Sequence, residues 1–108
     1  MALLMKAVLE NELCREVICS RTYTTEPMIA YPEGQPLSNW FIRRIEDRDC
    51  GSVKVLAGKT GFVNESGSCA VSYAETADGK GFLCVTGNAY SQWRVIDDHA
   101  ELYRTYCK

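Results

Sequence analysis

The fold is decided by the stretch Val53-Lys54-Val55-Leu56-Ala57-Gly58-Lys59-Thr60-Gly61-Phe62, a β-branched run that ends in a Lys-Thr-Gly triplet. Its first valines alternate with a lysine, which predicts a half-buried strand. The end of the strand carries an ammonium, a hydroxyl and a glycine that leaves the backbone uncovered. Such groups can hold a carboxylate and offer peptide N–H groups to an oxyanion. Alone the triplet is a weak signal, because its flanking glycines also suit a bulge or turn beside ordinary surface residues.

Length and charge limit the classes of function that the chain can have. Its 108 residues allow one small domain, or a piece of a larger one, and the net charge is −2. This charge gives no electrostatic reason to expect nucleic acid or an acidic membrane as a partner. No apolar stretch approaches the ~20 residues of a membrane span. The start, Met1 to Lys6, is too short and too soon charged for a secretory signal, so any export signal would lie outside this chain.

The cysteines and the single histidine give little support for a metal site. The six cysteines form no Cys-x-x-Cys pair and the only histidine is His99, so we expect no metal and no cofactor. Cys69 and Cys84 lie within apolar strand patterns, where cysteine acts as a small hydrophobic residue. We therefore expect free, mostly buried thiols, with the redox compartment left open.

Residues 1–20 are predicted to be helical. Apolar side chains recur at helical spacing in a first short helix, at Leu3, Leu4, Ala7 and Val8. Asn11 can end this helix and cap a second one from Glu12 to Ile18. Leu13, Val17 and Ile18 of the second helix are expected to share one side.

Residues 21–49 are predicted to form a long, irregular connection. Arg21 to Thr25 has strand propensity and ends before Pro27, and all three prolines of the chain lie in this segment. A short helix around Asn39 to Ile45 is expected to insert Trp40, Phe41 or Ile42 into the core. The mixed charges that follow, between Arg43 and Asp49, are typical of a solvated surface.

Residues 50–88 are predicted to form an antiparallel sheet. Strands are expected at 53–60, 68–76 and 81–87, separated by short loops rich in Gly, Asn, Asp and Ser. Neighbouring strands joined by such short loops pair antiparallel. The three strands therefore make a meander.

A last helix is predicted over 91–107, with Ser91 as its cap. Its apolar stripe recurs at steps of three and four residues, at Trp93, Ile96, Ala100, Tyr103 and Cys107. His99 lies off this stripe, so we expect it to be solvated and not to act as a base. Together the elements predict an α+β fold, a three-stranded antiparallel meander flanked by helices.

The region around the triplet resembles a known enzyme family. Gly58-Lys59-Thr60-Gly61-Phe62-Val63-Asn64-Glu65-Ser66-Gly67-Ser68-Cys69, followed by two apolar strands around Asp78-Gly79 and a helix, resembles part of the serine-type D-alanyl-D-alanine carboxypeptidases. These are the low-molecular-mass penicillin-binding proteins. Residues 2–11 and 21–24 are similar to the helix and the strand-like segment that precede this part of the family. The resemblance covers nearly the whole chain in the order of the family, and is far more specific than the triplet.

The resemblance implies part of a β-lactamase/transpeptidase-like domain in the cell envelope, and acyl transfer without a cofactor. A family serine attacks a peptidoglycan stem peptide ending in D-Ala-D-Ala, and β-lactams acylate the same serine. Lys59 would supply positive charge and a proton-relay contact, and Thr60 would bind the terminal carboxylate of the substrate. Gly61 would let the substrate lie against the strand. The backbone N–H of Phe62 would be one donor of the oxyanion hole.

The chain departs from the family in lacking the nucleophile. No Ser-x-x-Lys, Ser-x-Asn or Tyr-x-Asn sequence occurs anywhere in it. We therefore expect these residues to be the C-terminal part of a catalytic domain, inactive without the missing upstream half. Loss of that half would expose apolar surface and favour a homo-oligomer.

Three other interpretations compete with this one. A phosphate-binding loop fails, because Val53 occupies the place of its first glycine and no long helix is expected after Thr60. A non-catalytic binding module that keeps the carboxylate-binding strand stays open. So does a small interaction domain whose triplet is accidental.

Overall fold

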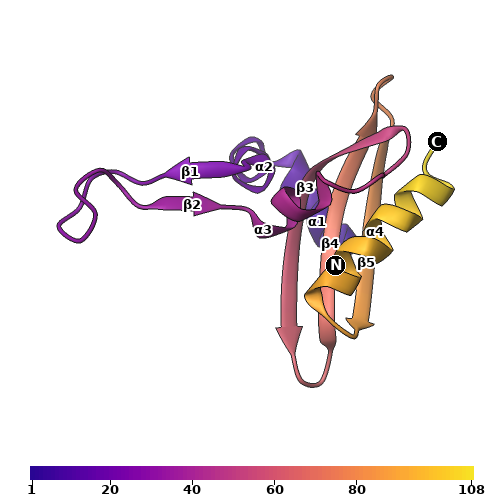
Figure 1. Cartoon of the computed structure of the whole chain (residues 1–108). Helices are drawn as coiled ribbons and strands as arrows, with labels where there is room; N and C mark the ends of the chain where they lie inside the picture. The colour runs from indigo at the N-terminus through magenta and orange to yellow at the C-terminus, as the bar shows by residue number, and fades with distance from the viewer.

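The chain folds into helices and strands arranged as an α+β structure, as predicted. The computed structural model describes all residues, 1–108. Along the chain these are α1 (Ala2–Glu10), α2 (Glu12–Cys19), β1 (Thr22–Thr24), β2 (Pro36–Ser38), α3 (Trp40–Ile45), β3 (Val53–Val63), β4 (Gly67–Thr76), β5 (Gly81–Ala89) and α4 (Gln92–Tyr106). Figure 1 shows the three long strands side by side, with the β1 and β2 pair extending away from them.

The three long strands form the expected antiparallel meander in the order β3-β4-β5. Each strand runs one to three residues beyond its predicted bounds, at one end only. The turns between them use glycine in the left-handed region, Gly67 with φ +66° and Gly79 with φ +89°. Glycine adopts this conformation without the steric cost that a Cβ imposes, which explains its place in both turns.

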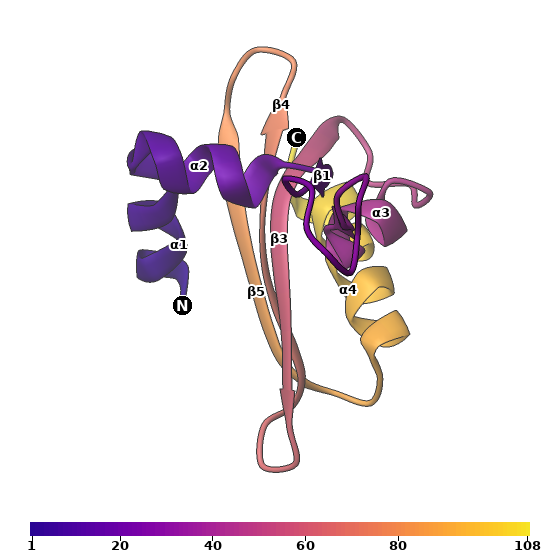
Figure 2. The same ribbon diagram turned by 90° about the vertical axis from the view of Figure 1, so that its left-hand side faces the viewer.

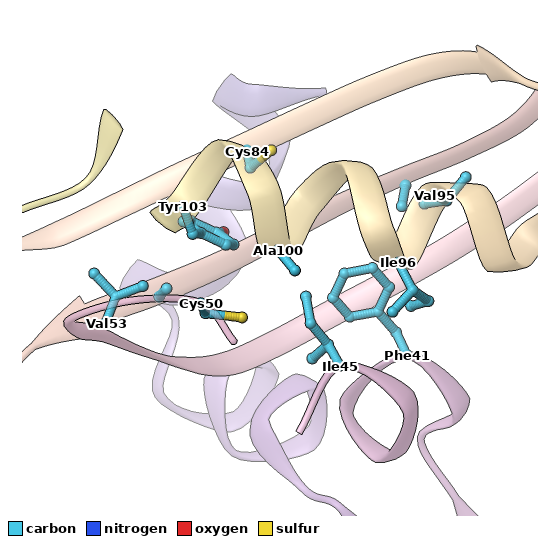
Figure 3. Packing of buried hydrophobic residues seen from close by; sticks show 11 residues of the cluster. Phe41, Ile45, Cys50, Val53, Cys84, Val95, Ile96, Ala100 and Tyr103 are labelled. Atoms are coloured by element: carbon cyan, nitrogen blue, oxygen red, sulfur yellow. The ribbon is translucent and has the colours of Figure 1, made fainter. Parts of the chain in front are cut away.

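Helices cover both faces of the sheet. Figure 2 shows α1 and α2 on one side and α3 and α4 on the other. The main core lies between the sheet and the α3/α4 layer (Figure 3), where buried side chains from all these elements meet: Phe41, Ile45, Cys50, Val53, Ala70, Ala74, Cys84, Val95, Ile96, Ala100 and Tyr103. A much smaller cluster on the other face joins Met5 to Ala57 and Val71. The α1/α2 layer is therefore held by far less buried apolar surface.

The two N-terminal helices form as predicted, but their apolar sides are largely exposed. Asn11 caps α2 with its side-chain oxygen, which accepts a hydrogen bond from Cys14 N–H at 3.0 Å. Met5 is the only buried residue of α1, and α2 has none. Leu13 and Val17 of α2 are 69% and 67% exposed, so the expectation that they pack inward is wrong.

The segment 21–49 is more ordered than the irregular connection that the sequence predicted. Its β1 and β2 pair antiparallel, with Tyr23 opposite Leu37. Pro36 obscured this hairpin in the sequence, but a proline is tolerated in a two-stranded ribbon, where one side of each strand has no partner. The short helix was predicted correctly: Asn39 caps α3 by accepting from Ile42 N–H at 3.1 Å, and Phe41 is buried.

Two expectations for α4 are wrong. His99 has no exposed surface, although it was expected to be solvated, and Trp93 is 52% exposed, although it was placed on the inward stripe. The buried face of the helix is instead made by Val95, Ile96, His99, Ala100 and Tyr103. On this face the imidazole of His99 finds hydrogen-bond partners in polar side chains of β4 and β5. The predicted cap is correct, since Ser91 Oγ accepts from Arg94 N–H at 3.1 Å.

All six cysteines are free thiols, as expected. The expectation that most of them are buried is wrong, because only Cys50 and Cys84 are buried and Cys14 is exposed. Cys69 is partly buried and lies near the start of β4, at a register shift between β4 and β5.

Candidate functional site

The Lys-Thr-Gly triplet lies on an edge strand, next to a point where that edge is covered. β3 has β4 as its only neighbour in the sheet. The side-chain amide of Asn39 donates a hydrogen bond to Gly58 O at 2.9 Å, so the start of α3 covers the strand at Gly58. Beyond this contact, an added Cβ on Gly61 would meet no atom within 4 Å. The face of the strand is therefore empty at Gly61, and no second strand pairs with the edge where the triplet lies.

The bond from Asn39 also shows which backbone groups of the triplet face outward. Since Gly58 O points away from β4, the two-residue period of an antiparallel strand turns the backbone groups of Thr60 and Phe62 outward as well. No register shift occurs between Ala57 and Val63 to disturb this alternation. The N–H of Phe62 is thus turned toward the side of β3 that has no partner strand.

Gly58 is required by the close approach of α3. An added Cβ at this position would lie 2.2 Å from Cδ1 of Phe41 and within 2.8 Å of two further ring atoms. Phe41 belongs to the main core, so its ring has little room to move. The packing of α3 on this glycine fixes the position of β3 relative to α3 just before the triplet.

We expect Gly58→Ala to destabilise the protein, because the added methyl group overlaps the Phe41 ring. Overpacking of this kind costs about 1–3 kcal/mol of the free energy of unfolding, which urea denaturation would measure. Gly61→Ala, three residues along the same strand, is the matched control, because its methyl group enters open space. Equal stabilities of the two variants would contradict the proposed role of the Phe41 contact.

Lys59 carries an ammonium group that no carboxylate neutralises. Its side chain is exposed, forms none of the four ion pairs of the structure, and donates from Nζ to Thr60 O at 2.5 Å. Side chains alternate along the strand, so Lys59 shares the α1 face with Ala57 while Thr60 shares the α4 face with Gly58. The charge is therefore available to an anionic ligand at this edge.

Two hollows lie on the two sides of the triplet, and Lys59, Thr60, Gly61 and Phe62 line both. The hollow on the α1 face has a volume of about 350 Å³ and is mainly apolar, with Met1 and Val85 in its wall. The other has a volume of about 310 Å³, and Ser68 and Gln92 line it. The four consecutive residues singled out in the sequence therefore all border the same two hollows.

A serine and a histidine are in hydrogen-bond contact elsewhere in the fold, where no substrate can reach them. Ser72 Oγ lies 2.7 Å from His99 Nδ1 and 2.7 Å from Tyr103 Oη, and Thr86 Oγ1 lies 2.9 Å from His99 Nε2. Ser72, His99 and Tyr103 are all completely buried. Burial lowers the pKa of His99 to about 4, so its imidazole is neutral at pH 7. We interpret this group as a structural network beneath α4.

No nucleophile is poised beside the triplet. Ser66, Ser68 and Cys69 line the hollows, but no hydrogen bond joins any of them to Lys59, and the Cys69 thiol donates only to the backbone carbonyls of Ser66 and Gly67. No group of three or more His, Cys, Asp or Glu side chains is placed to hold a metal ion, and no helix is both long and apolar enough to cross a membrane. The arrangement can bind an anion and offer a peptide N–H, and no side-chain base is hydrogen-bonded to the hydroxyls or the thiol beside it.

Comparison with known proteins gives no relative. No protein-family model, curated protein or solved structure matches this chain. The geometry of the triplet and the resemblance of its sequence therefore carry the functional argument.

Proposed function

We propose that this chain is part of a serine-type D-Ala-D-Ala carboxypeptidase and provides the strand that binds the substrate. The observation that carries this proposal is the position of Lys59-Thr60-Gly61 on the uncovered stretch of an edge strand, with an unpaired ammonium and an outward N–H on Phe62. An extended peptide can add to such an edge through its backbone, and a carboxylate at its end can be held by charge.

Each of the four residues has a role in this proposal. Lys59 supplies positive charge and a proton-relay contact, Thr60 binds the terminal carboxylate of a stem peptide, and Gly61 leaves room for the peptide on the strand. The Phe62 N–H stabilises the oxyanion that forms when a serine attacks the penultimate carbonyl. The terminal D-alanine then leaves, and water hydrolyses the acyl-enzyme. Since the chain has no Ser-x-x-Lys sequence, the attacking serine belongs to another polypeptide segment and the isolated chain is inactive.

A non-catalytic binding module derived from the same fold is the second candidate. It is favoured by the combination of an unpaired Lys59 with the absence of a base in hydrogen-bond contact with Ser66, Ser68 or Cys69 beside the triplet. Both candidates require the strand to bind a D-Ala-D-Ala carboxylate, and only the first requires acylation once a nucleophile is supplied.

Binding of D-Ala-D-Ala by the isolated chain tests the shared part of both candidates. We expect addition of N-acetyl-D-Ala-D-Ala to shift the amide NMR signals of Thr60, Gly61 and Phe62. Lys59→Ala should weaken this binding about tenfold, because a charge-assisted contact is lost. The same peptide with an amidated C-terminus is the control, since it lacks the carboxylate. Equal binding of both peptides, or no shift on β3, would contradict the proposal.

A further inference from the structure

The outer edge of β5 is open, and the register of the sheet shows which of its backbone groups are unpaired. β5 has β4 as its only neighbour. Thr76 N–H bonds Lys80 O at 2.9 Å, so these residues form a hydrogen-bonded pair at the start of the ladder. The alternation of antiparallel pairs then turns the backbone groups of Gly81, Leu83 and Val85 away from β4. Three consecutive outward positions are thus free to pair with another strand.

From Gly81 to Val85 this edge lacks the features that normally prevent pairing between proteins, because the one register shift of β5 lies beyond these residues, between Thr86 and Ala89. The nine residues of β5, Gly-Phe-Leu-Cys-Val-Thr-Gly-Asn-Ala, include no charged residue and no proline. Edge strands in monomeric proteins are usually protected by charges, prolines, bulges or a covering segment. The opposite edge of the same sheet does carry such features along part of its length, because β3 holds two charged residues, Lys54 and Lys59, and Asn39 covers it at Gly58, just before the open triplet.

The side chains beside the open edge are apolar and partly exposed. Leu83 is 37% exposed and Val85 is 45% exposed. Val85 lies opposite Val71 in the register, so both face the α1 side, where Val85 also lines the apolar hollow beside Met1. A strand added at this edge would extend an apolar surface that the thin α1/α2 layer leaves partly uncovered.

We propose that a second copy of this chain pairs its β5 with β5 in antiparallel orientation, so that two sheets join into one of six strands. A strand that meets itself about a two-fold axis is self-complementary, and each outward N–H faces a C=O of the partner. The absence of charge on β5 means that the two copies meet without repulsion between like charges on the paired strands. This favours a second copy over a charged peptide, which would gain no ion pair here.

Sedimentation of the chain over tens to hundreds of micromolar tests the pairing. We expect the mass to rise from 12.1 kDa to twice that value with concentration. Val85→Pro removes an outward N–H while leaving the bonds to β4 intact, so it should weaken dimerisation at least about tenfold. Val85→Thr is the matched control, because it keeps both the N–H and the β-branched shape and should dimerise as the unaltered chain does.

Hydrogen exchange in the unaltered chain tests the same pairing without a substitution. The amides of Leu83 and Val85 should be protected at high concentration and exchange rapidly on dilution, while those of Phe82 and Cys84 stay protected at both. A chain that stays monomeric at every concentration would overturn the proposal. It would do so even if the β5 edge bound an added peptide. If Val85→Thr abolished the dimer as fully as Val85→Pro, the contact would lie on the apolar face of the sheet. That result would also overturn the proposed pairing of the edges.

Discussion

Lys59→Ala is expected to slow penicillin acylation by about a hundredfold or more once the strand is part of a complete enzyme, because a preorganised electrostatic contact to the reacting group is lost. The complete enzyme would be made by joining this chain to the segment of a D-Ala-D-Ala carboxypeptidase that carries Ser-x-x-Lys. Labelling would be followed by intact mass. Thr60→Val should slow labelling in the same direction, since it removes the hydroxyl while keeping the β-branched shape that suits a strand.

The controls separate loss of chemistry from loss of folding. Lys54→Ala removes an exposed lysine from the same strand, away from the triplet, and should leave labelling unchanged. The isolated chain should show no adduct at all. A stoichiometric adduct on the isolated chain would mean that it carries its own nucleophile. Acylation of the Lys59→Ala enzyme at the unaltered rate would remove Lys59 from the proposed site.

The sheet could be predicted from sequence because each of its strands is specified locally. Alternating residues mark the start of β3, short apolar runs mark β4 and β5, and the glycines at positions 67 and 79 mark the turns. The β1/β2 hairpin has no comparable signal, since its strands are three residues long and one begins at Pro36. Its pairing depends on two segments separated by a loop, and local propensity does not report such contacts.

The candidate site was predictable in its residues but not in its geometry. Lys59-Thr60-Gly61-Phe62 could be read from the sequence, yet which backbone groups face outward depends on the contact between Asn39 and Gly58. The glycine before the triplet is explained by the Phe41 ring, which comes from a helix far earlier in the chain. Both facts arise from tertiary packing of α3 on the strand.

His99 was placed wrongly because its burial depends on partners from other elements. A histidine off the apolar stripe of a helix is ordinarily solvated. Here Ser72 on β4 and Thr86 on β5 satisfy both ring nitrogens, so burial costs much less than it would for an unpaired imidazole. The sequence spacing between these three residues gives no indication that they meet.

Because the imidazole of His99 is buried, we expect the protein to lose stability in mild acid. The pKa of His99 falls from its ordinary value of 6.5 to about 4 because burial disfavours the charged form, which the carboxylate of Asp98 only partly offsets. The unfolded chain therefore binds a proton at a higher pH than the folded one. The contribution of His99 to the free energy of unfolding is fully present above pH 6.5 and decreases by about 3 kcal/mol as the pH falls to 4.

Urea denaturation at a series of pH values between 7 and 4 would measure this loss, with His99→Gln as the control. Glutamine keeps hydrogen-bonding groups but cannot titrate, so the variant should start less stable and lose little stability down to about pH 5. The carboxylates of Glu46 and Asp78 have pKa values lowered by hydrogen bonds from Arg21 and Thr76, so their contributions disappear only at lower pH. The interval from pH 6.5 to 5 therefore reports mainly on His99.

Titration of the His99 ring signals by NMR gives an independent measurement in the unaltered protein, and does not depend on the variant folding. The ring should stay neutral down to pH 5 and share its two nitrogens between Ser72 and Thr86. Protonation would make both nitrogens donors, and Ser72 Oγ would then have to donate to Tyr103 while accepting from the imidazolium. The hydroxyls can adopt that arrangement, so the cost of acid comes mainly from placing a charge in the core. A ring that titrates near pH 6.5 in the folded protein would show that the imidazole is solvated, and would contradict the network beneath α4.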